Sequence, residues 1–154
     1  GNRVQANFIG TDSSGTPIPN GYQRIQSRGM NNTIGADLET ADADVGASGN
    51  VVSFDVPWGL IQRDGSENVF RGNTFLSTSN ASAILFASSG FVPNDLGDVD
   101  TGTNNLQNYP EFDDSQTQWN ESTGQLEVRY RVTSNLSDAA YPLKIDFYLA
   151  PKSN

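Results

Sequence analysis

Three short phrases of the sequence begin with asparagine and continue into β-branched or aromatic residues. They are Asn7-Phe8-Ile9-Gly10, Asn50-Val51-Val52 and Asn73-Thr74-Phe75-Leu76. The last two begin about 23 residues apart, a period that is typical of stacked coils rather than of an ordinary globular fold. A related phrase precedes each later copy, with Asn32-Thr33-Ile34 before the second and Asn68-Val69-Phe70 before the third. These phrases predict a repeat protein that is built from coils.

The repeats predict three columns of stacked strands. The columns are placed at 22–26, 58–62 and 82–86, at 31–35 and 67–71, and at 6–10, 50–54 and 73–76. Each strand of such a stack pairs with its counterpart one coil away, so we expect Val51 and Phe75 to be neighbours. An asparagine at a column end suits a bend and can bond to the asparagine of the next coil. We expect a structural asparagine ladder, the alternative being that these side chains bind a ligand.

Two polar segments interrupt the period, and both are predicted to be insertions at turns, where a solenoid tolerates them. One is residues 11–20, which contain Gly15, Pro17 and Pro19. The other is residues 37–48, whose acidic side chains alternate with alanine. That alternation offers no fixed ligand geometry, so we expect a solvated loop there.

Composition limits the classes of function. The chain has 154 residues, 35% of them hydrophobic, and 15 glycines, which suits an all-β fold of many short strands and tight turns. The net charge of −9 argues against nucleic acid and anionic membranes as partners. The sequence contains neither cysteine nor histidine, which excludes thiolate metal sites, histidine-ligated zinc and histidine-dependent catalytic triads. No stretch approaches the roughly 18 apolar residues of a membrane span.

Two segments carry a resemblance to a known family. Residues 7–16 followed by Asn31-Asn32-Thr33-Ile34-Gly35 resemble the repeats of secreted bacterial right-handed parallel β-helix proteins, the pectate-lyase-like superfamily in its largely uncharacterised branch. Residues 93–110 are similar to the segment with which many of these proteins leave the helix. The resemblance implies the C-terminal part of a bacterial protein that is secreted or displayed on the cell surface, with a right-handed parallel β-helix of about three coils. No catalytic motif of the pectate lyases is evident, so the resemblance implies architecture and not activity.

Three regions follow from this reading: the coils at 1–92, an acidic junction loop at 93–112, and antiparallel strands at 113–154. Residues 125–132 and 143–149 alternate apolar and polar side chains. The first segment places Leu126, Val128, Tyr130 and Val132 on one face, and in the second Leu143, Ile145, Phe147 and Leu149 are expected to face inward. Gln118-Trp119-Asn120 is expected to add a third strand. These strands form either a cap over the last coil or the first part of a β-sandwich.

The first coil is expected to expose the edges of its strands, which natural solenoids normally cover. We therefore expect either self-association with a neighbouring copy or upstream coils at this end.

The candidate metal site is the acidic spacing Asp95, Asp98 and Asp100. Calcium takes six to eight oxygen ligands in flexible geometry, which carboxylates of a glycine-containing loop can supply. The amides of Asn94, Asn104 and Asn105 lie nearby in the sequence. The segment lacks the full EF-hand series. Structural calcium at the junction is therefore the prediction, and the alternative is an exposed acidic loop whose aspartates cap turns.

Candidates for catalysis are Arg24, Arg28, Arg63 and Arg71 as proton abstractors, or Asp55 and Asp64 as a carboxylate pair for glycoside hydrolysis. The pKa of an arginine lies far above neutrality, so its use as a base requires an unusual environment. Tyr22, Trp58 and Trp119 are candidates for a sugar-stacking platform, although such aromatic residues also fill cores. The favoured function is an extracellular structural or adhesive module that is stabilised by calcium and has polysaccharide or cell-surface glycan as its ligand class. The alternative is a fragment of a polysaccharide lyase or hydrolase.

Overall fold

The computed structural model describes residues 1–18, 25–54, 58–77, 82–86, 91–137 and 143–148. They form two compact units. The first contains the described residues of Gly1–Val92 and Gly102–Asn105, together with the segment that begins at Asp146. The second contains Pro93–Thr101 and the described residues of Leu106–Ile145.

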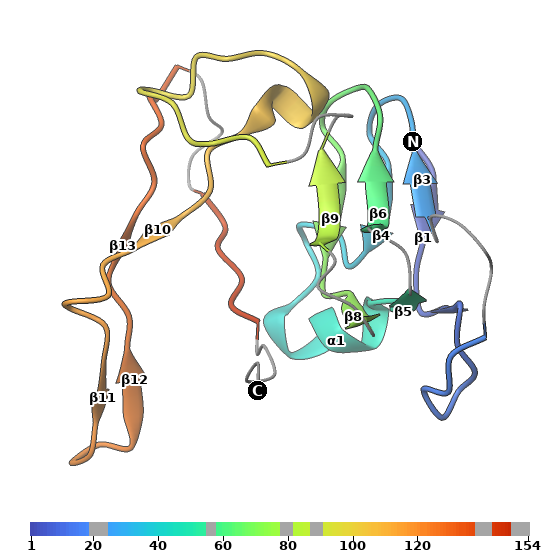
Figure 1. The fold of residues 1–154 in the computed structure, drawn as a ribbon, viewed down its shortest axis with the longest axis horizontal. Coiled ribbons are helices and arrows are strands. Elements are labelled where there is room, and N and C mark those ends of the chain that lie inside the picture. The colour runs from blue at the N-terminus through green and yellow to red at the C-terminus, as the bar shows by residue number, and fades with distance from the viewer. Residues whose placement is uncertain (19–24, 55–57, 78–81, 87–90, 138–142, 149–154) are drawn as a thin grey trace. The chain divides into compact units, whose positions relative to one another are not determined.

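The described part of the first unit is built on three parallel sheets, each of three strands (Figure 1). The sheets are β1 (Arg3–Val4), β4 (Thr33–Gly35) and β7 (Val69–Arg71); β2 (Phe8–Ile9), β5 (Val51–Phe54) and β8 (Thr74–Ser77); and β3 (Ile25–Ser27), β6 (Trp58–Gln62) and β9 (Ser82–Phe86). Each sheet takes one strand from each of three successive passes of the chain. The three predicted strand columns are confirmed, and β1 adds a strand that the repeat phrases did not mark.

The register of the sheets follows the asparagines. Val51 pairs with Thr74, and Val52 pairs with Phe75. The expectation that Val51 and Phe75 are neighbours is therefore wrong by one residue. The reason is that the backbone N–H of Asn50 donates to Oδ1 of Asn73, which aligns the two phrases at their first residue.

Helices are few and short in the described residues. They are η1 (Asp42–Asp44), α1 (Val45–Ser48) and η2 (Thr103–Leu106). The first two lie in the predicted insertion at 37–48. None of the described helices is both long enough and apolar enough to cross a membrane. The all-β prediction is confirmed, but the parallel sheets are neither curled nor closed on themselves, so the β-helix remains a prediction.

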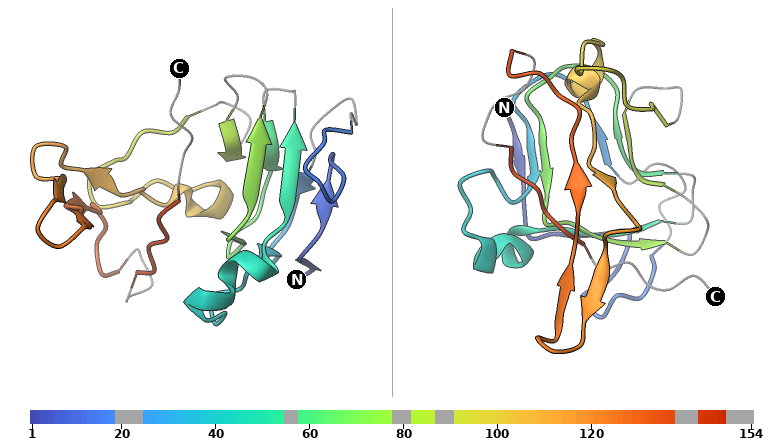
Figure 2. Two further views of the ribbon diagram at one scale, coloured as in Figure 1. Left: turned by 90° about the horizontal axis from the view of Figure 1, so that it is seen from below. Right: turned by 90° about the vertical axis from the view of Figure 1, so that its left-hand side faces the viewer.

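The core lies among the parallel sheets, whose central strands are β4, β5 and β6, one in each sheet. Figure 2 gives two further views of these sheets. Val52, Leu60 and Ile61 are completely buried. The rings of Phe70 on β7 and Phe86 on β9 lie 5.9 Å apart and tilted, which joins two of the sheets through aromatic contact.

Asparagine side chains connect the successive passes of the chain in two ladders. In the first ladder, the backbone N–H and Nδ2 of Asn2 donate to Oδ1 of Asn32 at 3.0 and 3.1 Å. The same two donors of Asn32 bond to Oδ1 of Asn68 at 2.9 Å each. The backbone N–H of Asn68 then donates to Oδ1 of Asn104 at 2.8 Å. The predicted ladder is confirmed, and it gains Asn2 and Asn104 as members that the sequence reading had not assigned to it.

The second ladder joins Asn7, Asn50 and Asn73 in the same geometry, with donor–acceptor distances of 2.9 to 3.1 Å. Its amides also serve the neighbouring sheet, because Nδ2 of Asn50 donates to the carbonyl of Val4 and Nδ2 of Asn73 to that of Ile34. This close approach requires glycine at position 35. Its φ is +94°, and a Cβ there would stand 2.0 Å from the carbonyl oxygen of Arg71.

The described part of the second unit contains two short antiparallel pairs. β11 (Gln118–Asn120) pairs with β12 (Gln125–Glu127), and β10 (Glu111–Phe112) pairs with β13 (Tyr130–Arg131). The predicted strand at Gln118-Trp119-Asn120 is confirmed.

One further expectation for the C-terminal region is wrong, and a second holds for only part of its residues. The described residues 143–148 contain no strand. There the side chain of Asp146 binds Arg71, and the hydroxyl of Tyr148 accepts the backbone N–H of Gly72, so side chains rather than a strand ladder hold this segment. Among the side chains expected to share an apolar face or to point inward, Leu126, Tyr130 and Phe147 are 59%, 41% and 58% exposed. Val128, Val132, Leu143 and Ile145 are half-buried, and Leu149 lies outside the described residues. For Leu126 and Tyr130 the reason is that the described pairs have only two strands each, too few to bury an apolar face.

The ladder predicts a position-dependent cost for asparagine substitution. Asn50 is fully buried and both gives and receives amide hydrogen bonds, so Asn50→Ala leaves several buried partners unsatisfied. We expect a loss of about 2–4 kcal/mol in the free energy of unfolding, measured by urea titration. Asn7→Ala, at the exposed end of the same ladder, is the matched control and should cost about 1 kcal/mol or less. Equal losses for the two variants would contradict the structural role of the ladder.

Candidate metal centre

Three carboxylates of the second unit converge in one loop. Asp95, Asp98 and Asp100 each offer an oxygen within 4.8 Å of the other two. The backbone bends between them, because Gly97 and Asp98 both have positive φ, of +86° and +64°. This φ strains any L side chain at position 97, and a Cβ there would also displace the amide of Asn135, from whose Nδ2 it would stand 2.5 Å. The structure thus brings together the three aspartates that the sequence spacing predicted.

Asn108 fastens this loop to the rest of the second unit. Its side chain is buried, with Oδ1 accepting the backbone N–H of Asp95 at 3.0 Å and Nδ2 donating to the carbonyl of Asp95 at 2.9 Å. The same Nδ2 also donates to the carbonyl of Thr133. The sequence analysis did not predict this role for Asn108, because in the sequence it is one more asparagine in a polar loop.

Asp98 is the most buried of the three, at 6% exposure, and both of its oxygens have partners. Oδ1 accepts the backbone N–H of Asn108 at 2.8 Å, and Oδ2 accepts the hydroxyl of Ser134. Asp98 therefore holds the loop in shape as well as contributing negative charge.

Asp95 and Asp100 each have a carboxylate oxygen that accepts no hydrogen bond from the described residues. Oδ2 of Asp95 accepts the backbone N–H groups of Val99 and Asp100 at 3.2 Å each. Oδ1 of Asp95 and Oδ1 of Asp100 are buried atoms with no hydrogen-bond partner among the described residues. Burial, followed by the charges of Asp95 and Asp98, raises the pKa of the Asp100 carboxyl above its ordinary value. A cation would satisfy both the two oxygens and the clustered charge.

The neighbouring amides have other roles. Nδ2 and Oδ1 of Asn94 bond to the carbonyl and N–H of Tyr109 at 2.9 Å each. Asn104 belongs to the first unit, where it ends the first ladder. The expectation that Asn104 supports the acidic loop is therefore not met, and its spacing of 36 residues after Asn68 was the missed signal.

The first unit contains a buried arginine, Arg71, whose side chain is 4% exposed. Its Nε and Nη2 bind the two carboxylate oxygens of Asp146 at 2.6 and 2.9 Å. Nη2 also binds Asp42 at 3.0 Å, and Nη1 donates to the carbonyls of Asp37 and Thr40. The hydrogen bond to Asp146 is the main cause that raises the pKa of Arg71, which is the wrong direction for a proton abstractor. Arg71 instead ties the insertion and the C-terminal segment to β7.

Of the remaining catalytic candidates, the structure describes some and leaves others outside the described residues. Arg28 pairs with Asp64 at 3.5 Å, and Asp64 also accepts the backbone N–H of Gly29 at 2.7 Å. Arg24 and Asp55 lie outside the described residues. The described side chains therefore give no support to an Asp55–Asp64 pair.

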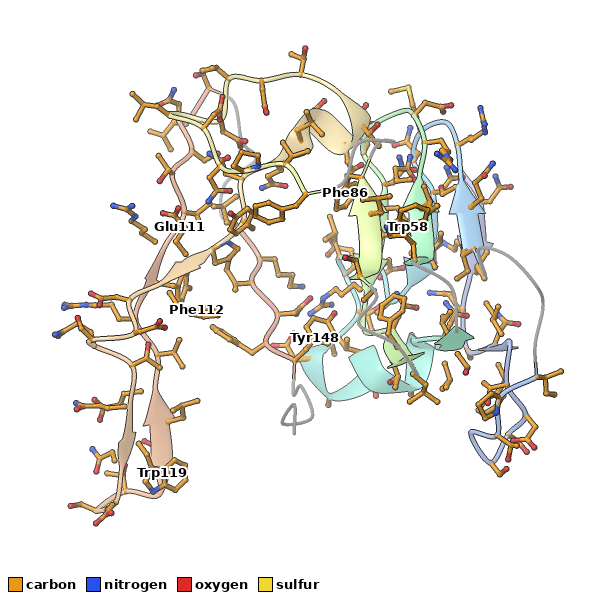
Figure 3. All side chains as sticks on the ribbon, in the orientation of Figure 1. Trp58, Phe86, Glu111, Phe112, Trp119 and Tyr148 are labelled. Atoms are coloured by element: carbon orange, nitrogen blue, oxygen red, sulfur yellow. The ribbon has the colours of Figure 1, made fainter. Side chains whose placement is uncertain are left out.

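The predicted aromatic platform stays a prediction. Tyr22 lies outside the described residues. Trp58 is half-buried at the start of β6 in the first unit, and Trp119 is 61% exposed on β11 in the second unit (Figure 3).

The raised pKa of Asp100 predicts a pH-dependent stability of the metal-free protein. A carboxyl whose pKa is raised by folding stabilises the fold while protonated, so its contribution is full below 3.8 and is lost as the pH rises through the folded-state value. We compare the free energy of unfolding of Asp100→Asn with that of the wild type in the presence of chelator. As the pH rises from about 3.8 to neutrality, the variant should become more stable relative to the wild type. Urea titrations across this range measure it, and a pH-independent difference would contradict the crowding of the three carboxylates.

Comparisons with known proteins give the chain no relative from which a role could be transferred. No family model, no curated protein and no solved structure matches it. The functional assignment therefore rests on the geometry of the two units.

Proposed function

We propose that this chain is a structural or adhesive module of the cell exterior, in which a short right-handed parallel β-helix is joined to an antiparallel unit that calcium stabilises. One observation carries the proposal: the described asparagines at the ends of the parallel strands bond to one another from pass to pass. Buried amides used in this way support a scaffold, because their donors and acceptors are consumed by neighbouring passes.

The β-helix proposal is supported by the common order of the three parallel sheets. In each sheet the strand of the middle pass lies between those of the earlier and later passes. Consecutive strands of one pass belong to different sheets, so the chain turns between sheets and returns one pass later. This is the path that a solenoid of strands requires, and connections between parallel strands are nearly always right-handed.

The calcium proposal is supported by the chemistry of the acidic loop. Carboxylate oxygens are the hard ligands that calcium prefers, and its flexible coordination tolerates an irregular loop. Oδ1 of Asp95 and Oδ1 of Asp100 are the first candidates for ligands, since both are buried without a partner in the described part of the chain. Asp98 supplies a third negative charge close by and keeps the loop attached to Asn108. Bound calcium would stabilise the second unit by removing the repulsion among the three carboxylates.

Calcium binding is tested by calorimetric titration of protein that has been stripped with chelator. We expect saturable binding of one ion and a rise in melting temperature with calcium. Asp100→Asn removes one open oxygen and one charge, and it should weaken binding at least about tenfold. The matched control is Glu121→Gln, an exposed acid of the same unit, which should bind like the wild type.

The affinity for calcium also indicates whether the protein works outside or inside the cell. A dissociation constant of about 10⁻⁴–10⁻³ M suits an extracellular module, whereas a value near 10⁻⁷ M would point to an intracellular sensor. A flat titration of the wild type would end the calcium proposal, and it would leave the asparagine scaffold untouched.

The outer edges of β1, β2 and β3 suggest how the module associates. In the described residues each of these strands pairs on one side only. Asn2 and Asn7 begin their ladders there as donors to the next pass. A further asparagine-bearing strand could therefore extend each ladder by donating to their Oδ1 atoms. We propose that a second copy of the chain uses this edge.

Sedimentation equilibrium tests the association. We expect the average mass to rise with protein concentration in the micromolar range. Arg3→Pro and Phe8→Pro place a residue without an N–H in edge strands, and at least one of them should shift the protein toward monomer. A single monomeric species at every concentration would count against use of this edge.

A further inference from the structure

The outer edge of β7 has no fourth strand beside it among the described residues, since β7 pairs there with β4 alone. On β4 itself, the pairing with β7 satisfies three backbone groups at the two ends of the strand. The N–H of Asn32 donates to Oδ1 of Asn68, and the carbonyl of Asn32 accepts the N–H of Val69. At the other end, the N–H of Ala36 donates to the carbonyl of Arg71. The corresponding groups of β7 would need the same kinds of partner from a further pass of the chain.

Asn104 supplies two of these partners. The register of β4 and β7 makes Asn68 the counterpart of Asn32. Oδ1 of Asn104 accepts the backbone N–H of Asn68 at 2.8 Å, and its Nδ2 donates to the carbonyl of Asn68 at 2.9 Å. The backbone N–H of Asn104 donates to the carbonyl of Gly65 at 2.7 Å, which fastens it within the first unit. One amide thus occupies both backbone groups of Asn68 that a further pass would bond.

Tyr148 supplies the third partner. In the same register Gly72 is the counterpart of Ala36, and the hydroxyl of Tyr148 accepts the N–H of Gly72 at 2.7 Å. Two residues earlier, the carboxylate of Asp146 binds Nε and Nη2 of the buried Arg71 at 2.6 and 2.9 Å. Figure 3 shows Tyr148 beside the elements of the first unit. Side chains alone therefore hold residues 146–148 at the end of β7.

The opposite edge of the same sheet carries complementary groups. Asn2 donates to Asn32 through its N–H and Nδ2, but its own Oδ1 accepts no hydrogen bond from the described residues. The register makes Arg3 the counterpart of Val69, whose N–H donates to the preceding pass at the carbonyl of Asn32. The N–H of Arg3 therefore points away from β4. An open Oδ1 followed by an outward N–H is the pair of groups that the N–H and carbonyl of Asn68 would bond.

Complementary edges on one molecule lead to open-ended association, because each added copy presents a new edge to the next. Natural sheets block such growth at their edges. We infer that Asn104 and residues 146–148 form an intramolecular plug that prevents head-to-tail stacking of copies. The partner that fits the edge of β7 when the plug is displaced is the β1 edge of a second copy. The inference rests on the proposed association of copies and names the contact that limits it.

Sedimentation equilibrium and negative-stain electron microscopy of the full chain test the plug. Asn104→Gly removes the amide at a residue whose φ of 54° suits glycine, and Tyr148→Phe removes only the hydroxyl. Each should lower the concentration of half-association at least about tenfold, and the double variant should form rods of many copies. The matched control is Asn105→Gly, which should associate like the wild type. Asn105 has a φ of 59°, and its exposed side chain makes no hydrogen bond within the described residues.

Arg3→Pro separates ordered stacking from aggregation of unfolded chains. It removes the N–H that would donate to Asn68 of the next copy, so it should return the double variant to the association of the wild type. Arg3→Ala loses the ion pair with Asp37 but keeps the N–H, and it should leave the rods intact. Unchanged association of both plug variants, or assembly that persists with Arg3→Pro, would overturn the inference. A wild type that stays monomeric while the double variant forms rods would refute the association proposed for the wild type and support the plug.

Discussion

The asparagine amide is the interaction on which the first unit depends. Its oxygen accepts two donors from the asparagine of the preceding pass, while its backbone N–H and Nδ2 bond to the oxygen of the next. No other side chain of this length offers an acceptor and two donors at a bend, so serine or aspartate could satisfy only part of the set. Because the ladder fixes which residues of successive passes face each other, it also fixes the strand register and the apolar rows behind it.

A second buried polar group, Arg71, solves a different problem. Neither the insertion at 37–48 nor the described part of the segment that begins at Asp146 contains a strand, so no sheet holds them. One guanidinium holds both, since its fork binds Asp146 in bidentate fashion and reaches the carboxylate of Asp42. A buried charge with several partners contributes little net stability, but its partners become costly to lose. Arg71 therefore makes the position of these polar segments depend on a single side chain.

The sequence allowed the strand columns and the ladder to be predicted, because both depend on local phrases that repeat. It also indicated Asp95, Asp98 and Asp100, since a single bend can bring together three acids within six residues. What it could not indicate was pairing that depends on single residues far apart in the chain, such as Arg71 with Asp146. The exposure of Leu126 and Tyr130 was missed for a related reason: alternation shows that a strand has two different faces, but it does not show whether anything covers the apolar one.

The two units differ in the charge of the buried acceptors that have no partner among the described residues, and this difference bears on where function lies. In the first unit the amides of the ladders and the guanidinium of Arg71 are bonded to other parts of the same unit, and the acceptor without a partner is the neutral Oε1 of Gln62. In the second unit the acceptors without a partner are two carboxylate oxygens, one of Asp95 and one of Asp100. Groups that a fold leaves unsatisfied are the ones that an ion or a ligand can satisfy. The parallel sheets are thus best understood as a scaffold, and the antiparallel unit as the part of the chain whose chemistry is directed outward.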